Sequence, residues 1–186
     1  VGGSWTDTGA GTLTERTGTV TFDGTGTLNS NETFYNITVN SSGTVTLGAA
    51  LDIDNTLTLS AGTLDASGTN YGITVGASWT DTGAGAFTER SGTVTFDGTA
   101  GTVNSNDNFY NVTINNAGTT TLGATLDVDG TLTLTAGALD ISATLYGINV
   151  AGSWTDTGAG TFTERTGTVT FDGTGTVNAN ETFANV

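Results

Sequence analysis

The stretch Gly18-Thr-Val-Thr-Phe-Asp-Gly24 decides the fold class, because it alternates apolar and polar residues and then ends in a turn signal. In an extended strand, Val20 and Phe22 face one side and the threonines face the other. Asp followed by Gly favours a turn. The same residues return as Gly92-Thr-Val-Thr-Phe-Asp-Gly98 and Gly167-Thr-Val-Thr-Phe-Asp-Gly173. The chain is therefore a repeat of strands and turns.

A second string fixes the length of the repeat. Ser-Trp-Thr-Asp-Thr-Gly-Ala-Gly begins at Ser4, Ser78 and Ser153, which gives periods of 74 and 75 residues, and the extra residue is Ala100. We divide the chain into repeat 1 (residues 1–74), repeat 2 (75–149) and a partial repeat 3 (150–186), together expected to form one continuous solenoid. Because the sequence breaks off within a repeat and has no Met, we expect it to be a window of a longer protein.

Short bursts of the same alternation fill each repeat and predict an all-β chain. Ile37-Thr-Val39, Leu51-Asp-Ile53 and Leu57-Thr-Leu59 are examples, and nothing recurs at helical spacing. One or two inward residues per burst are too few for the two facing sheets of a sandwich. A parallel β-helix needs only a narrow core of small residues, because its turns stack about 4.8 Å apart. We therefore predict a parallel β-helix (β-solenoid) of tandem ~75-residue repeats, with roughly 18 to 25 residues per turn.

Composition excludes several functions. The chain has 18 acidic residues against three arginines and no Lys, His, Cys, Pro or Met, so its net charge is -15. That charge repels nucleic acid, and the lack of Cys excludes disulfides. No apolar run approaches the roughly 20 residues that cross a bilayer, so we expect no membrane insertion within this sequence. Without His, Cys or Lys to act as acid, base or nucleophile, we expect no enzyme, although sugar lyases and glycosidases can use carboxylates and Arg alone.

Three segments resemble a known family: Gly18-Thr-Val-Thr-Phe-Asp-Gly24, Phe34-Tyr-Asn-Ile-Thr-Val39 and Gly130-Thr-Leu-Thr-Leu-Thr-Ala-Gly137. They resemble the repeats of bacterial surface and secreted β-strand-repeat proteins, an adhesin-like group that includes filamentous-haemagglutinin-type β-helices. The resemblance covers the whole sequence and rests on strand repeats. It implies a right-handed parallel β-helix in an extracellular fibre or adhesin at the cell surface, and it brings no catalytic or ligand residues.

Two sets of equivalent residues are expected to be structural. Trp5, Trp79 and Trp154 are interpreted as large core or rim residues, with a glycan-binding platform as the alternative. Arg16, Arg90 and Arg165 each follow a Glu, which points to the opposite face of the strand. Each Arg is therefore expected to pair with a carboxylate on a neighbouring turn, and the proposed partners are Asp7, Asp81 and Asp156.

Other polar residues invite a ligand or a modification. The pairs Asp52/Asp54 and Asp127/Asp129 are weak calcium candidates, because two carboxylates share one strand face; a solvated acidic edge explains them as well. No other cofactor is expected. Five Asn-x-Ser/Thr sequons are candidate glycosylation sites: Asn31, Asn36, Asn40, Asn111 and Asn180.

The leading functional hypothesis is a structural or adhesive extracellular protein that forms a rod, stalk or filament, with end-to-end self-association of open strand edges. The alternative is a glycan-binding or ice-binding β-solenoid module, with surface glycans as partners in the first case. Thr-x-Thr pairs such as Thr19/Thr21 and Thr56/Thr58 suggest a hydroxyl-and-methyl lattice, yet their irregular spacing along the sequence argues against a regular ice-binding plane.

Overall fold

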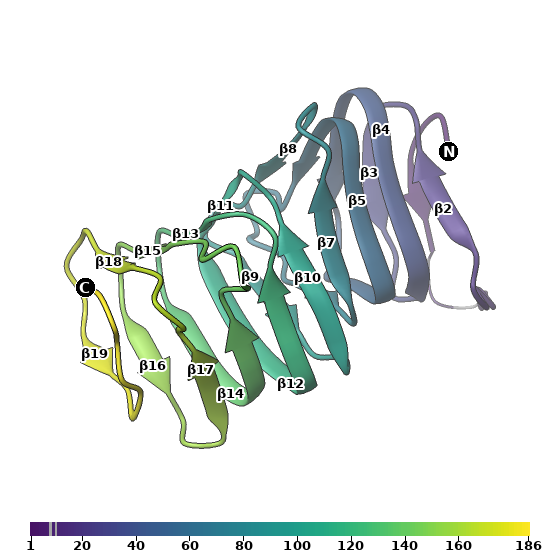
Figure 1. The fold of residues 1–186 in the computed structure, drawn as a ribbon. Coiled ribbons are helices and arrows are strands. Elements are labelled where there is room, and N and C mark those ends of the chain that lie inside the picture. Colours follow the sequence, from purple (N-terminus) through teal and green to yellow (C-terminus); the bar gives the residue numbers. More distant parts are fainter. Residues whose placement is uncertain (8, 10) are drawn as a thin grey trace.

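The chain is a rod of stacked turns built from strands alone. The computed structural model describes residues 1–7, 9 and 11–186, and no helix occurs in these ranges. None of them therefore forms a helix long and apolar enough to span a bilayer. Figure 1 shows the chain winding from the N-terminus at one end of the rod to the C-terminus at the other. The predicted all-β parallel solenoid is confirmed.

The two longest strands, β4 (Thr33–Leu47) and β5 (Leu51–Asp65), each follow the wall of the solenoid around its bends. Register shifts in their pairing mark where the chain turns a corner. The other strands are β1 (Trp5–Thr6), β2 (Thr19–Phe22), β3 (Gly26–Asn29), β6 (Ile73–Val75), β7 (Ser78–Asp81), β8 (Gly85–Thr88), β9 (Thr93–Phe96), β10 (Ala100–Asn104), β11 (Asn108–Phe109), β12 (Asn111–Leu122), β13 (Leu126–Val128), β14 (Leu132–Asp140), β15 (Ile148–Val150), β16 (Trp154–Asp156), β17 (Gly160–Thr163), β18 (Val169–Phe171) and β19 (Val177–Asn178).

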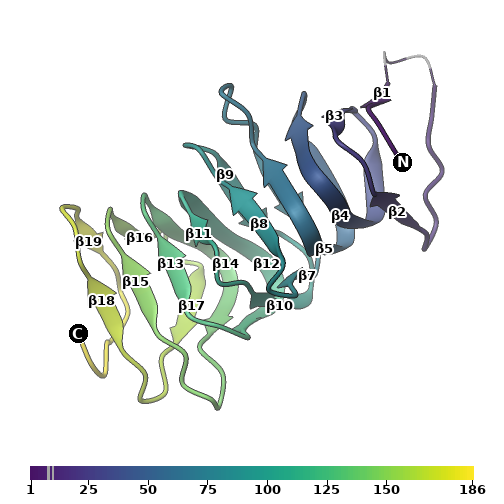
Figure 2. The same ribbon diagram turned by 90° about the horizontal axis from the view of Figure 1, so that it is seen from above.

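All strand pairs in the described part of the chain are parallel, as Figure 2 shows from above. Their register defines three core ladders. Ladder A consists of Val20, Ile37, Leu57, Trp79, Val103 and Leu122. Ladder C consists of Leu51, Ile73, Val94, Val112, Leu132, Trp154 and Val177. Ladder B lies between A and C in each turn and includes Trp5, Leu28 and Leu47, and later Leu126, Ile148 and Val169.

Turn length varies because the loops between strands vary. Successive members of ladder A are 17 to 24 residues apart. The average is about 21 residues per turn, and the chain makes about eight turns. The average agrees with the predicted turn length of roughly 18 to 25 residues, and the shortest spacing, from Val20 to Ile37, lies one residue below that range.

The sequence repeat is out of phase with the turns. From Val20, the chain crosses ladder A again at Ile37, Leu57 and Trp79, which completes three turns. It then passes ladder B and reaches ladder C at Val94, the equivalent of Val20 in the next repeat. One repeat therefore spans three and two-thirds turns. Each repeat is rotated by one third of a turn relative to the one before it.

The tryptophans show the consequence of this rotation. Trp5 lies in ladder B, Trp79 in ladder A and Trp154 in ladder C. Residues that are equivalent in sequence therefore occupy three different faces of the rod, so they cannot line up along one of them.

Large side chains fill the interior, which corrects the expectation of small inward residues. Trp79, Trp154 and Phe34 are each 0% exposed, and Phe22 and Phe109 are each 1% exposed. Three walls enclose a space that aliphatic residues alone would leave partly empty. Because protein interiors are packed without voids, aromatic rings occupy the middle of the rod.

Candidate binding surface

Threonines form continuous ladders on the outside of the rod. Threonine ladder 1 runs beside core ladder A and consists of Thr21, Thr38, Thr58 and Thr80. Threonine ladder 2 runs beside core ladder C and consists of Thr74, Thr95, Thr113, Thr133 and Thr155. Each Thr lies directly opposite the next across one parallel strand pair. The loops absorb the irregular sequence spacing, which removes the objection to a regular array.

A second outward rank flanks each threonine ladder. Beside ladder 2 it is formed by the residues two positions before Thr95, Thr113, Thr133 and Thr155, which are Thr93, Asn111, Thr131 and Ser153; before Thr74 the position is Gly72. All four side chains are uncharged. Together the two ranks form a neutral strip, four turns long, on a chain whose net charge is -15.

Asn111 joins neighbouring turns within this strip. Its side-chain oxygen accepts a hydrogen bond from the Thr131 backbone N–H at 2.9 Å. In repeat 1, Asn36 accepts in the same way from the Thr56 N–H at 3.2 Å and also from the Asn55 side-chain amide at 2.8 Å. These amides hold the corner between two turns, so the second rank is fixed in place.

The indoles of repeats 2 and 3 are enclosed by other aromatic rings. The ring centroid of Trp79 lies 4.8 Å from that of Phe87 and 5.1 Å from that of Phe109, both edge to face. Trp154 makes the equivalent contacts with Phe162 at 5.0 Å and Phe183 at 5.1 Å. Both tryptophans are fully buried, so neither is available as a platform for a sugar ring.

The buried indole N–H groups of Trp79 and Trp154 have no hydrogen-bond partner among the described residues. The indoles lie among other aromatic rings, which offer only weak acceptors. These tryptophans therefore stabilise the interior by packing, although burying an indole N–H without a hydrogen-bond partner is unfavourable.

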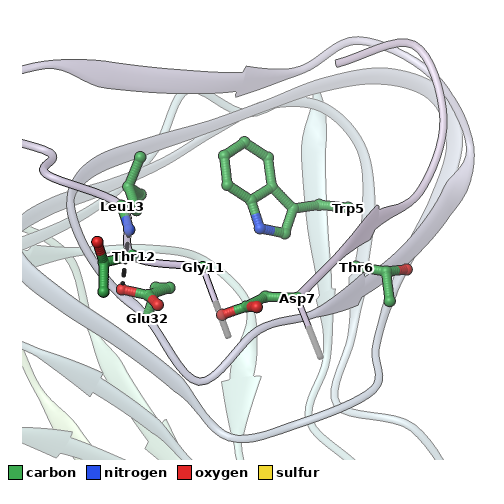
Figure 3. A pocket seen from close by; sticks show the side chains of 7 residues that line it. All are labelled: Trp5, Thr6, Asp7, Gly11, Thr12, Leu13 and Glu32. Atoms are coloured by element: carbon green, nitrogen blue, oxygen red, sulfur yellow. Dashed lines mark hydrogen bonds between the residues drawn. The ribbon is translucent and has the colours of Figure 1, made fainter. Parts of the chain in front are cut away.

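Trp5 has a more open environment, shown in Figure 3. It is half-buried and contacts Phe34 with ring centroids 5.4 Å apart, but Leu13 stands where repeat 2 has Phe87. A hollow of about 240 Å³ lies beside the indole and is also lined by Asp7 and Glu32. The Leu13 backbone N–H donates to the Glu32 carboxylate at 3.1 Å across one side of it.

Arg90 and Arg165 pair with carboxylates other than those predicted. Arg90 donates through Nε and Nη2 to the two oxygens of Asp65 at 2.9 and 2.8 Å, and Arg165 binds Asp140 in the same fork, with both distances 2.8 Å. The arginine lowers the pKa of each of these carboxyl groups through the hydrogen bonds it donates. No salt bridge to Arg16 occurs among the described residues.

The predicted partners Asp7, Asp81 and Asp156 instead stabilise turns. Asp81 accepts a hydrogen bond from the Gly83 backbone N–H at 2.8 Å, and Gly83 has a φ of 88°, which favours glycine. Asp7 and Asp156 do the same with the glycine two residues later. A carboxylate held by its own turn does not reach the Arg of the next one.

The calcium candidates lie in two acidic clusters. Asp52 and Asp54 lie near Asp97, and burial followed by repulsion from Asp52 raises the pKa of Asp97. In the second cluster, burial followed by repulsion from Asp129 raises the pKa of Asp127. Within the described residues, no group of three or more acidic side chains is arranged to hold a metal ion. Calcium binding by these pairs stays a prediction.

The five sequons fall into two environments. Asn31, Asn40 and Asn180 are exposed. Asn36 and Asn111 are half-buried and use their side-chain oxygens to join turns. The exposed three offer the better access for glycosylation, which stays a prediction for all five.

No protein-family model, curated protein or solved structure matches this chain.

Proposed function

We propose that this protein is a structural or adhesive rod that acts outside the cell, at its surface. The observation that carries the proposal is the unbroken stack of parallel turns, with the two chain ends at opposite ends of the rod. Each turn adds about 4.8 Å of length for about 21 residues, so the length of the rod grows in proportion to the number of turns. The resemblance to bacterial surface β-strand repeats and the strongly acidic composition support the same role.

The proposal includes end-to-end association. A terminal turn of a solenoid presents unpaired backbone N–H and C=O groups, which can pair with the edge of another copy.

Electron microscopy and sedimentation at increasing concentration test this role. We expect straight rods that lengthen with concentration, because open strand edges of neighbouring copies can pair. Rods that do not lengthen at any concentration would exclude a filament and leave the single-chain stalk. Round, bead-like particles would overturn the rod.

The proposal contains no catalytic activity. Turnover of any member of a broad polysaccharide panel by purified protein would contradict it.

A second candidate function is binding through a face of the rod. The neutral strip along threonine ladder 2 favours it, because this surface repeats regularly and carries no charge on a chain whose net charge is -15. The buried Trp79 and Trp154 weaken the glycan version of this function. The remaining version is binding of an ordered, neutral surface.

A further inference from the structure

We infer that the neutral strip along threonine ladder 2 binds ice. This inference rests on the second candidate function, binding through a face, and is independent of the rod. The strip comprises ladder 2 and the rank beside it, defined above, and both ranks are present on four successive turns.

The spacing of the strip is that of a two-dimensional lattice. Neighbouring turns place equivalent side chains about 4.8 Å apart along the rod, and outward residues two positions apart on a strand are separated by about 6.7 Å. Oxygen atoms on the prism planes of hexagonal ice form a rectangular grid of comparable dimensions. A row of hydroxyls at a constant interval can therefore meet one lattice row repeatedly.

The chemistry of the strip suits water held in a lattice. A Thr hydroxyl both donates and accepts hydrogen bonds, as each water molecule in ice does, and its methyl group covers adjacent apolar surface. The Thr side chains of ladder 2 are half-buried, and a β-branched side chain has few rotamers, so little entropy is lost on binding. No charged residue in either rank organises water in a competing pattern.

Other occupants fit less well. A second copy of the chain would bury a strip of only about 190 Å², from about 19 Å of length and about 10 Å of width, whereas stable complexes bury about 800 Å² per partner. A sugar ring stacks well on an aromatic platform, and neither rank contains one. A nucleic acid is repelled by the net charge. An ice crystal offers a periodic surface without charge.

The chain carries this motif twice. Threonine ladder 1 presents four threonines beside core ladder A, one third of a turn around the rod from ladder 2. Because equivalent positions rotate with each repeat, the two arrays face different directions. One flat crystal face meets one array at a time, so the two arrays act as independent sites.

Thermal hysteresis and the shaping of a single ice crystal test the inference on the intact chain. We expect measurable hysteresis and faceted crystals from the unaltered protein. Thr113→Tyr places a bulky ring in the middle of ladder 2, and Thr58→Tyr does the same in ladder 1. Each single variant should lose about half of the hysteresis, and the double variant should lose nearly all, because effects at separate sites add.

Thr125→Tyr is the matched control, since Thr125 is exposed and belongs to neither ladder. Circular dichroism and the melting temperature establish that each variant remains folded. Folded protein without hysteresis or crystal shaping overturns the inference, and so does a folded double variant with full activity. Neither result bears on the proposed rod, which electron microscopy tests separately.

Discussion

Repeats 1 and 2 place an equivalent tryptophan in two different environments. Trp79 is packed against Phe87 and Phe109 and is fully buried. Trp5 keeps the contact to Phe34 but faces Leu13, and a hollow of about 240 Å³ remains beside it. The backbone pairing is parallel in both repeats. Where repeat 2 has Phe87, repeat 1 has Leu13, and the interior beside the tryptophan is open. Main-chain pairing maintains the wall of the solenoid in both repeats.

Removing the indole should give the largest effect and the clearest difference between repeats. We expect Trp79→Ala to lower the free energy of unfolding by about 3 to 5 kcal/mol, because it leaves a large cavity in a closed core. Trp5→Ala should lower it by roughly 1 to 2 kcal/mol, since that indole is half-buried. Urea denaturation followed by circular dichroism measures both. Equal losses would mean that the hollow is closed in solution.

Exchanging the residues at the position of Leu13 and Phe87 should make the packing of each repeat more like that of the other. Phe87→Leu gives repeat 2 the side chain found in repeat 1, and we expect a loss of about 1 kcal/mol from the missing aromatic pair. Leu13→Phe should fill the hollow and stabilise the protein by a similar amount. Thermal melting detects both shifts. A destabilised Leu13→Phe variant would show that the hollow is too narrow for the ring.

A pH profile should give the smallest difference. Burial, followed by repulsion from Asp81, raises the pKa of Asp107, the repeat 2 equivalent of Glu32. A raised carboxyl pKa adds stability at low pH, and this is lost as the pH rises above 3.8 through the folded-state value. Asp107→Asn should therefore reduce the fall in melting temperature between about pH 4 and pH 7.

An Asp107→Asn variant whose melting temperature falls as steeply over this range as that of the unaltered protein would contradict the expectation.

The sequence predicted the parts of the fold that depend on local pattern. Alternation around Val20 and Ile37 gave strands, and thin apolar bursts gave a solenoid with about the right turn length. The partner of Arg90 could not be predicted, because it depends on which residue of the preceding turn lies beside it. A signal did exist: Asp65 and Asp140 each precede an Arg by 25 residues, close to one turn.

The threonine ladders were missed for a related reason. Thr95 and Thr113 are 18 residues apart and Thr133 and Thr155 are 22 apart, so the spacing looks irregular in sequence. Strand pairing sets the register, and the loops take up the difference. Sequence spacing therefore underestimates the regularity of a solenoid surface whenever its loops vary in length.

Because one repeat spans three and two-thirds turns, the number of repeats sets the direction in which the far end of the rod faces. Inserting or deleting one repeat would swing everything beyond it by a third of a revolution, besides changing the length. Only a change of three repeats would restore the original heading. In such a rod, a change in the number of repeats changes the direction in which the far end faces.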